Sequence, residues 1–215
     1  MGQGSLGDCS FAAAAISLAG VNPTAIRNMI QDHEDGTFTV TFPGRSPVTL
    51  TYDRNAPGAN TRDGIWLRVL EQAAARTLGN PTLSLFPREA IELLTGGPVN
   101  HRTWNFSSRD NWQGHIEESL SNGKPVAVSV GGGEAAGKKG YYNGIVTDHA
   151  YIIVGNNTAT QKYTLQNPWG RNGEWGQKYD WETKTWEYKP EYQDGRFEMT
   201  MKEIYDTFRR LDYQE

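Results

Sequence analysis

The sequence predicts an α+β fold with a helical first half and a strand-rich second half. Three observations support this prediction. Apolar residues recur at helical spacing over residues 9–19, 23–31, 64–78 and 87–94. Beyond residue 124, short runs rich in Val, Ile, Tyr and Thr replace them. Gly and Pro separate most of these segments. Where a helical part meets a sheet, we expect a seam in which a cleft can form.

The first predicted helix follows a glycine-rich loop and carries the only cysteine of the chain. Asp8 is favoured at a helix N-cap and Gly20 at a helix end, so we expect Cys9 in the first turn. Unpaired N–H groups and the positive end of the helix dipole favour a thiolate there. The alternative is a buried thiol with only a packing role. This stretch alone does not decide between the two.

Three further helices are expected. Asn22 and Pro23 supply an N-cap and a first-turn proline for a helix that runs through Gln31. Residues 64–78 and 87–94 each form an apolar helical pattern that glycine terminates. The first half of the chain is therefore expected to be mainly helical.

Strands are expected wherever β-branched and aromatic residues cluster. Residues 37–42 and 48–52 flank Pro and Gly and predict a hairpin. Residues 101–110 are irregular and polar-aromatic, which predicts a crossing between two parts of the chain, followed by a helix over 111–121. The strands predicted in the second half cover residues 125–130, 150–155, 162–166 and 196–201.

The composition excludes several classes of partner. A chain of 215 residues with 37% hydrophobic content can bury a full core. Its 21 basic and 25 acidic residues nearly balance and form no basic run, which disfavours a nucleic-acid partner. The longest apolar segment, residues 11–21, is too short to span a bilayer and lacks the charged lead-in of a signal peptide. We therefore expect neither a nucleic-acid nor a membrane partner.

A single cysteine excludes internal disulfides and multi-cysteine zinc sites. It is compatible with the cytoplasm and equally with secretion as part of a larger protein. The chain begins only eight residues before Cys9. We therefore expect a domain of a longer protein, whose other domains are partners of this one and whose targeting signals lie elsewhere.

A nucleophilic cysteine needs a base within hydrogen-bond reach and a third group that orients the base. His149 opens an apolar strand, which makes a rigid platform. Asn167 ends the next strand and offers an oxygen to the imidazole N–H, and the indole of Trp169 can shield that bond from water. Gln3 offers an amide donor that can form an oxyanion hole with the Cys9 N–H.

Each of these features also has an ordinary interpretation. A strand-end histidine can simply bond a backbone carbonyl, and residues 167–170 can be a plain turn. The other histidines lie in polar stretches and are expected at the surface; they are His33, His101 and His115.

Taken together, these motifs resemble the calpain family of papain-like cysteine proteases. The similar catalytic blocks are residues 3–9 (Gln-Gly-Ser-Leu-Gly-Asp-Cys), 149–151 (His-Ala-Tyr) and 167–170 (Asn-Pro-Trp-Gly). Further similar blocks follow in the family's order at residues 66–73, 94–97, 194–199 and 208–211. The resemblance implies a papain-like two-lobed fold: a helical lobe over residues 1–103, an antiparallel β-rich lobe over residues 104–215, and an active site in the cleft between them.

The resemblance also implies roles for five residues in a cysteine endopeptidase. Cys9 is the expected nucleophile, His149 the base and Asn167 the residue that orients it; Gln3 is the expected oxyanion donor and Trp169 the shield. The substrate is then a protein or peptide, and the domain can process its own parent chain. Two alternatives stay open: a transglutaminase-type acyltransferase, whose third residue is an Asp, and a binding module without catalysis.

The chain departs from the family pattern in two places. Ser10 stands where calpains carry a Trp, so the wall beside the nucleophile is less apolar. Calpain cores also bind calcium, and Glu174, Asp180 and Asp194 are the matching candidates, but Arg196 replaces a carboxylate ligand. Calcium needs several hard oxygen ligands, and a cation among them weakens the site. We therefore expect no required cofactor and weak or absent calcium dependence.

Overall fold

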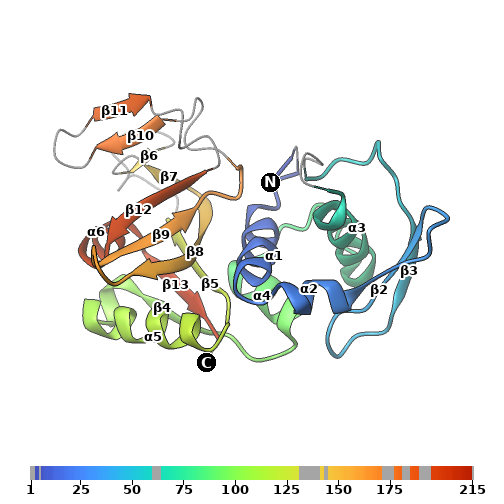
Figure 1. Cartoon of the computed structure of the whole chain (residues 1–215), viewed down its shortest axis with the longest axis horizontal. Helices are drawn as coiled ribbons and strands as arrows, with labels where there is room; N and C mark the ends of the chain where they lie inside the picture. The colour runs from blue at the N-terminus through green and yellow to red at the C-terminus, as the bar shows by residue number, and fades with distance from the viewer. Residues whose placement is uncertain are drawn as a thin grey trace.

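The computed structural model describes residues 3–4, 6–59, 64–130, 141–142, 145–170, 177–180, 185–188 and 195–214. Helices dominate the first half of the chain and an antiparallel sheet the second, which confirms the α+β class. Figure 1 shows the two halves side by side, with helix α1 (Cys9–Val21) between them.

The described part of the first half contains four helices and a small antiparallel sheet of order β1-β2-β3. Its elements after α1 are α2 (Pro23–Met29), β1 (Ile30–Asp32), β2 (Thr37–Val40), β3 (Val48–Thr51), α3 (Trp66–Leu78) and α4 (Pro87–Thr95). The predicted hairpin is confirmed, with Phe38 paired to Leu50 across β2 and β3.

The helix ends follow from local chemistry. Gly79 and Gly96 end α3 and α4 in the left-handed conformation, at φ 61° and 72°, as glycine permits. The side chain of Asn22 accepts the Ala25 N–H at 3.1 Å and caps α2. The prediction that α2 runs through Gln31 was wrong, because residues 30–32 leave the helix to pair with β2.

The second half is built on a six-stranded antiparallel sheet of order β12-β9-β8-β5-β13-β4. Its strands are β4 (Asn100–Thr103), β5 (Val126–Val130), β8 (His149–Asn157), β9 (Lys162–Gln166), β12 (Arg196–Thr200) and β13 (Arg210–Tyr213). The four strands predicted in this half are confirmed as β5, β8, β9 and β12.

Two strands of this sheet were not predicted. Residues 101–103 were expected to be irregular, but they belong to edge strand β4, which pairs with β13. Asn100 and His101 are exposed, so β4 lacks the apolar alternation that identifies a strand from sequence. Its pairing depends on backbone hydrogen bonds, which no side-chain pattern records.

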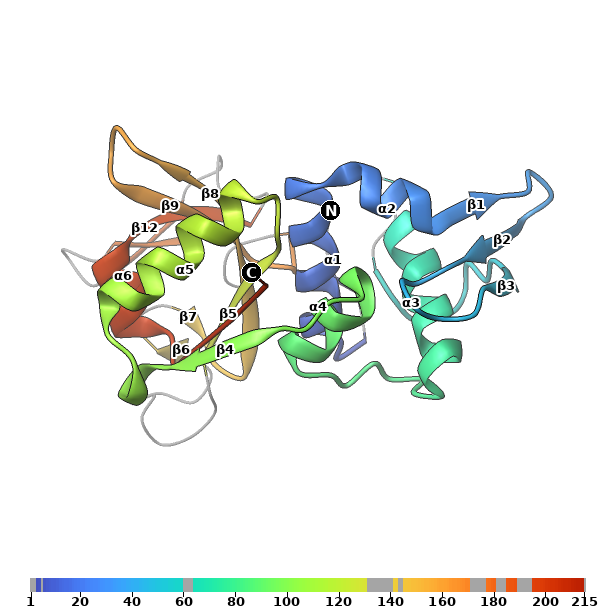
Figure 2. The same cartoon turned by 90° about the horizontal axis from the view of Figure 1, so that it is seen from below.

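The remaining elements surround the sheet. Helices α5 (Arg109–Ser121) and α6 (Met201–Thr207) lie together in Figure 2, and short helix η1 (Trp104–Phe106) precedes α5. Two-stranded pairs are formed by β6 (Tyr141–Tyr142) with β7 (Ile145–Val146), and by β10 (Gln177–Asp180) with β11 (Thr185–Tyr188).

The strand β8 separates two hydrophobic cores. Ala150 and Ile152 face the core that contains α1, whereas Tyr151 and Ile153 face the core that contains Trp112 of α5. This alternation is what a strand with both faces covered requires. The sheet thus has α1 on one face and α5 on the other.

Helix α1 is the most buried helix of the described chain, since residues 10–18 are all buried. Ala12, Ala13, Ala14 and Ala15 are at most 1% exposed. Side chains this small let the helix lie close to β8 and to α4. The Ser17 hydroxyl accepts the N–H of Val126 at 3.3 Å and ties α1 to β5.

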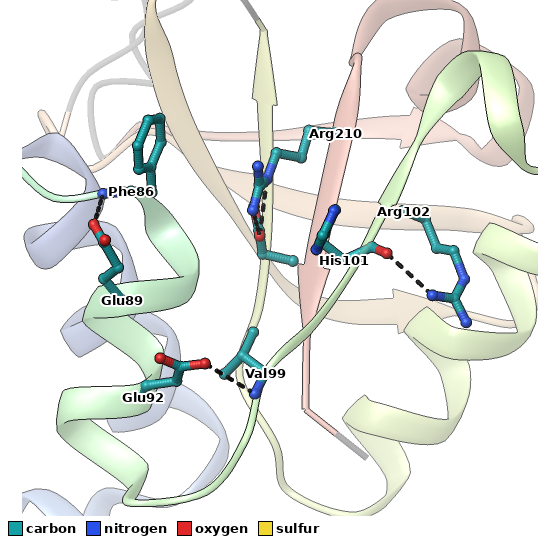
Figure 3. A network of polar contacts seen from close by, with 8 residues as sticks. Phe86, Glu89, Glu92, Val99, His101, Arg102 and Arg210 are labelled. Carbon is teal, nitrogen blue, oxygen red and sulfur yellow. Dashed lines mark hydrogen bonds and ion pairs between the residues drawn. The ribbon is translucent and has the colours of Figure 1, made fainter.

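A second contact between the halves lies where α4 faces β4 and β13 (Figure 3). The Glu92 carboxylate accepts the Val99 N–H at 3.4 Å, just before β4. The guanidinium of Arg210, in β13, lies 5.9 Å from the ring centroid of Phe86 at the start of α4. The same guanidinium donates to the buried carboxylate of Asp212 at 2.6 Å.

No single helix among the described residues is long and apolar enough to cross a membrane. Helices α1 and α2 meet the length and composition requirement only as a pair, and they are bent by 117° relative to each other.

The packing of α1 predicts the effect of a larger side chain. Ala15→Leu adds volume where no exposed surface remains, so we expect a loss of about 1–3 kcal/mol in the free energy of unfolding. Denaturant titration measures it. The control is Gly20→Ala in the same helix, at an exposed position whose added methyl meets nothing within 4 Å; it should stabilise by up to about 1 kcal/mol. Equal stability of the two variants would contradict the packing described.

Candidate active site

Cys9 is the first residue of α1, and its thiol is half-buried. The thiol lies against the backbone N–H of Ala150 and the N–H and hydroxyl of Ser10, which favour its charged form. Ala150 directly follows His149 in β8. The buried contact of α1 with β8 therefore places the thiol one residue from the histidine.

Burial raises the pKa of the Cys9 thiol, and the nearby Asp8 carboxylate raises it further. The hydrogen bonds from Ala150 and Ser10 oppose this shift. The pKa shift is opposite to the expectation of an easily ionised thiol, because loss of water disfavours the thiolate. Attack by this thiol therefore requires a base.

His149 is 5% exposed and is the first residue of β8. The residue before it, Asp148, has a left-handed backbone with φ of 51°, a conformation that Asp tolerates better than most residues. The ring atom Nε2 lies 2.9 Å from Oδ1 of Asn167. Because an amide oxygen only accepts, Nε2 carries the hydrogen and Nδ1 is left as the basic nitrogen.

Burial lowers the pKa of His149 to about 4, and the hydrogen bond with Asn167 opposes the shift. The imidazole is consequently neutral at pH 7. A neutral imidazole is the form that can take a proton from a thiol.

Asn167 is 1% exposed and follows directly on β9. Its backbone N–H donates to the Gly195 oxygen at 2.8 Å, and its Oδ1 also accepts the Trp169 N–H at 3.0 Å. The Trp169 ring lies 4.5 Å from that of His149, centroid to centroid. The indole and the amide thus contact the same imidazole and restrict its orientation.

Gln3 lies in the loop that precedes Cys9, which we call the nucleophile loop. It connects this loop to the turn after Asn167, because its backbone N–H donates to the Pro168 oxygen at 2.6 Å. Its side-chain Nε2 donates to Leu6 O at 2.6 Å and to Asp8 Oδ1 at 3.0 Å. An amide nitrogen has two hydrogens, so both are used within the loop. Donation to a substrate oxygen requires one of these two bonds to break.

Asp8 holds the N-cap position, but its side chain caps no N–H of the helix. It points to Gln3 and to Glu71 of α3 instead. Sequence reasoning missed Glu71, although a signal was present. Glu71 falls on the helical face marked by Leu67, Leu70 and Ala74, and a carboxyl group on an apolar face is expected to be buried.

Ser10 fills the position where the resemblance places a tryptophan. It is 8% exposed, and its hydroxyl is directed at the Cys9 thiol rather than at solvent. The wall beside the nucleophile is therefore polar at this point.

The calcium candidates Glu174 and Asp194, and the side chain of Asp180, lie outside the described residues. Within the described ranges, no group of three or more His, Cys, Asp or Glu side chains is arranged to hold a metal ion.

The other three histidines lie apart from Cys9 in the fold. His33 and His101 are exposed, as expected. The expectation of a surface position was wrong for His115, which is half-buried and stacks on Tyr213 with ring centroids 4.3 Å apart.

Comparison with known proteins identifies a family. The family model described as calpain family cysteine protease matches residues 1–214. The chain is 24% identical to calpain clp-1 of Caenorhabditis elegans, over 98% of this chain and 31% of that protein. It is 27% identical to calpain-12 of Homo sapiens, over 94% of this chain and 32% of that protein. It is 26% identical to the calpain-1 catalytic subunit of Mus musculus, over 98% of this chain and 34% of that protein. The chain thus spans about a third of the length of these relatives.

The contact between His149 and Asn167 gives a test that needs no substrate. Asn167→Asp keeps the oxygen that accepts from His149 and from the Trp169 N–H but adds a negative charge beside the ring, which favours the imidazolium. We expect the pKa of His149 to rise from about 4 to its ordinary value of 6.5 or above, as measured by NMR titration of the ring. The exposed control Asn28→Asp should leave the pKa near 4. An unchanged value in Asn167→Asp would show that the two side chains are apart in solution.

Proposed function

Because this chain belongs to the calpain family of cysteine proteases, we propose that it is a cysteine endopeptidase. The observation that carries the proposal is the buried hydrogen bond between His149 and Asn167, one residue from the backbone group that the Cys9 thiol contacts. The proposed substrate is a protein or peptide, with a longer parent chain among the possible targets.

The geometry supports a two-step reaction. Nδ1 of His149 takes the thiol proton while Sγ of Cys9 forms a bond to the peptide carbonyl carbon. The imidazolium then gives the proton to the leaving amine as the C–N bond breaks, which leaves a thioester. Water, deprotonated by His149, attacks the thioester, and the acid product leaves with the thiol restored.

Asn167 has a defined part in this scheme. Its neutral amide holds Nε2–H and so keeps the basic nitrogen at Nδ1. A carboxylate in its place would favour the charged ring before reaction, when the base must be neutral. This neutral third group supports hydrolysis by a protease and separates the chain from transglutaminases, whose third residue is an Asp.

The oxyanion that forms in each step needs hydrogen-bond donors. The backbone N–H of Cys9 is the first proposed donor, because a first-turn N–H of a helix has no intrahelical partner. Gln3 is the second proposed donor, after its amide releases Leu6 or Asp8.

We further propose that catalysis depends weakly or not at all on calcium. Arg196, at the start of β12, places a cation where the family pattern has a carboxylate. A fixed positive charge reduces the affinity of an oxygen-ligand site for a divalent cation.

The nucleophile is tested by substitution. Cys9→Ala should reduce kcat/KM on a denatured protein substrate by about 10⁴-fold or more, because no other group can form the thioester. Fragment masses measure the reaction and separate cutting of chains from joining of chains. The control, Gly20→Ala in the same helix, should cleave as the wild type does. Unchanged cleavage by Cys9→Ala would refute the proposal, and cross-linked products would favour acyl transfer.

Calcium dependence is tested with a chelator. Excess EGTA should change the cleavage rate less than about twofold, since a cation in place of a carboxylate ligand weakens calcium binding. A magnesium-loaded sample of equal ionic strength controls for salt. Loss of cleavage in EGTA, with recovery on adding micromolar calcium, would overturn this part of the proposal.

A further inference from the structure

Two carboxyl groups are buried together directly beside the nucleophile. Asp8 precedes Cys9 in the chain, and Glu71 projects from α3; each is 1% exposed. The reaction proposed above uses neither group. Two buried carboxylates would repel each other strongly, so their presence requires an explanation.

Each group has one conventional partner. The Ala59 N–H donates to Oε2 of Glu71 at 2.7 Å, and the Gln3 amide donates to Oδ1 of Asp8 at 3.0 Å. The second oxygen of each group has no hydrogen-bond donor among the described residues; these atoms are Oδ2 of Asp8 and Oε1 of Glu71. The two carboxyl groups face each other, since each shifts the pKa of the other, and a hydrogen bond between them would satisfy both of these oxygens. Such a bond needs a proton, because two carboxylates offer only acceptors.

The surrounding backbone is shaped to enclose the pair. A Cβ on Gly58 would lie 2.4 Å from Oε2 of Glu71, and a Cβ on Gly4 would lie 1.6 Å from the Gly58 oxygen. Only glycine at both positions lets the two loops close over the carboxyl groups. The arrangement therefore joins the nucleophile loop, the loop before α3 and α3 itself.

Among the described residues, two other charged or titratable groups face the pair. Arg68 of α3 faces Glu71 while its guanidinium bonds Arg54 O at 2.9 Å and Gly58 O at 3.4 Å. Cys9 of α1 faces Asp8. Burial, reinforced by Asp8, raises the pKa of Glu71 to about 9, and Arg68 only partly opposes this; burial also raises the pKa of Asp8.

We propose that Asp8 and Glu71 share one proton, and that this shared proton holds the loop that carries Gln3 and Asp8, and that leads into Cys9, against α3; we call this arrangement the clamp. Glu71 is then a positioning residue that acts through Asp8 on the amide of Gln3. The catalytic consequence rests on the proposed protease function; the clamp itself does not.

Loss of the proton should release the clamp. An unfolded Glu ionises near 4.5, whereas Glu71 in the folded chain retains its proton up to about pH 9. The folded state therefore binds more protons than the unfolded state between these values, and its stability falls as pH rises through that window. Above about pH 9 two negative charges face each other in a buried site.

The variant Glu71→Gln tests the clamp without removing its bonds. The new amide can donate to Asp8 and accept from Ala59, so it copies the protonated state at every pH. We expect its Tm to change little between neutral pH and about pH 9, while the wild-type Tm falls over the same range. The alkaline limb of kcat should move up by about one pH unit or more. The exposed control Glu118→Gln should behave as the wild type in both measurements.

Infrared spectroscopy detects the proton directly. The wild type at neutral pH should show a protonated-carboxyl band that disappears in Glu71→Gln. In Asp8→Asn, which serves if the first variant fails to fold, the band should shift in frequency, because the carboxyl group loses its carboxylate partner. Absence of the band in the wild type, or a Tm of Glu71→Gln that falls with pH as in the wild type, would overturn the clamp. If the band and the Tm behave as expected but no variant cleaves protein, the proposed function fails and the clamp stands.

Discussion

The burial of α1 between the two halves of the chain is the constraint on which the site depends. The alanines at positions 12–15 present almost no side chain, so β8 can approach the helix closely. That approach brings the first turn of the helix to the first residues of the strand. Cys9 and His149 begin these two elements, and the same contact buries both of them.

This burial also sets the electrostatics of the pair. Removal from water disfavours a charged thiolate and a charged imidazolium alike, so it raises the pKa of Cys9 and lowers that of His149. Both groups are therefore neutral at rest. Charge separates only when the thiol reacts, and the developing charges are then stabilised by N–H groups already in place at Ala150 and Ser10.

Features that depend on local chemistry could be predicted from the sequence. Glycines marked the ends of α3 and α4, alternation marked β8 and β9, and the spacing of polar residues at strand ends marked His149 and Asn167. These signals arise within a few residues of each other along the chain.

Features that depend on residues far away along the chain could not be predicted from the sequence. Strand β4 has no apolar pattern and is held by the backbone of β13, more than a hundred residues later. Asp8 was expected as a helix cap because its neighbours fit that role, but its side chain turns to Glu71 of α3. The direction of the Cys9 pKa shift likewise depends on how deeply α1 is buried, which no motif reports.

The amide of Gln3 links the carboxyl pair to the proposed chemistry, because it has fewer hydrogens than acceptors to satisfy. Its two hydrogens face three acceptors during a reaction: Leu6 O, Asp8 Oδ1 and the substrate oxyanion. The bond to Asp8, at 3.0 Å, is longer than the bond to Leu6, at 2.6 Å, and is the weaker constraint. If Asp8 were an isolated buried carboxylate, losing this donor would leave an uncompensated charge. A proton shared with Glu71 supplies Asp8 with a second donor, and thereby lowers the cost of turning Gln3 toward the oxyanion.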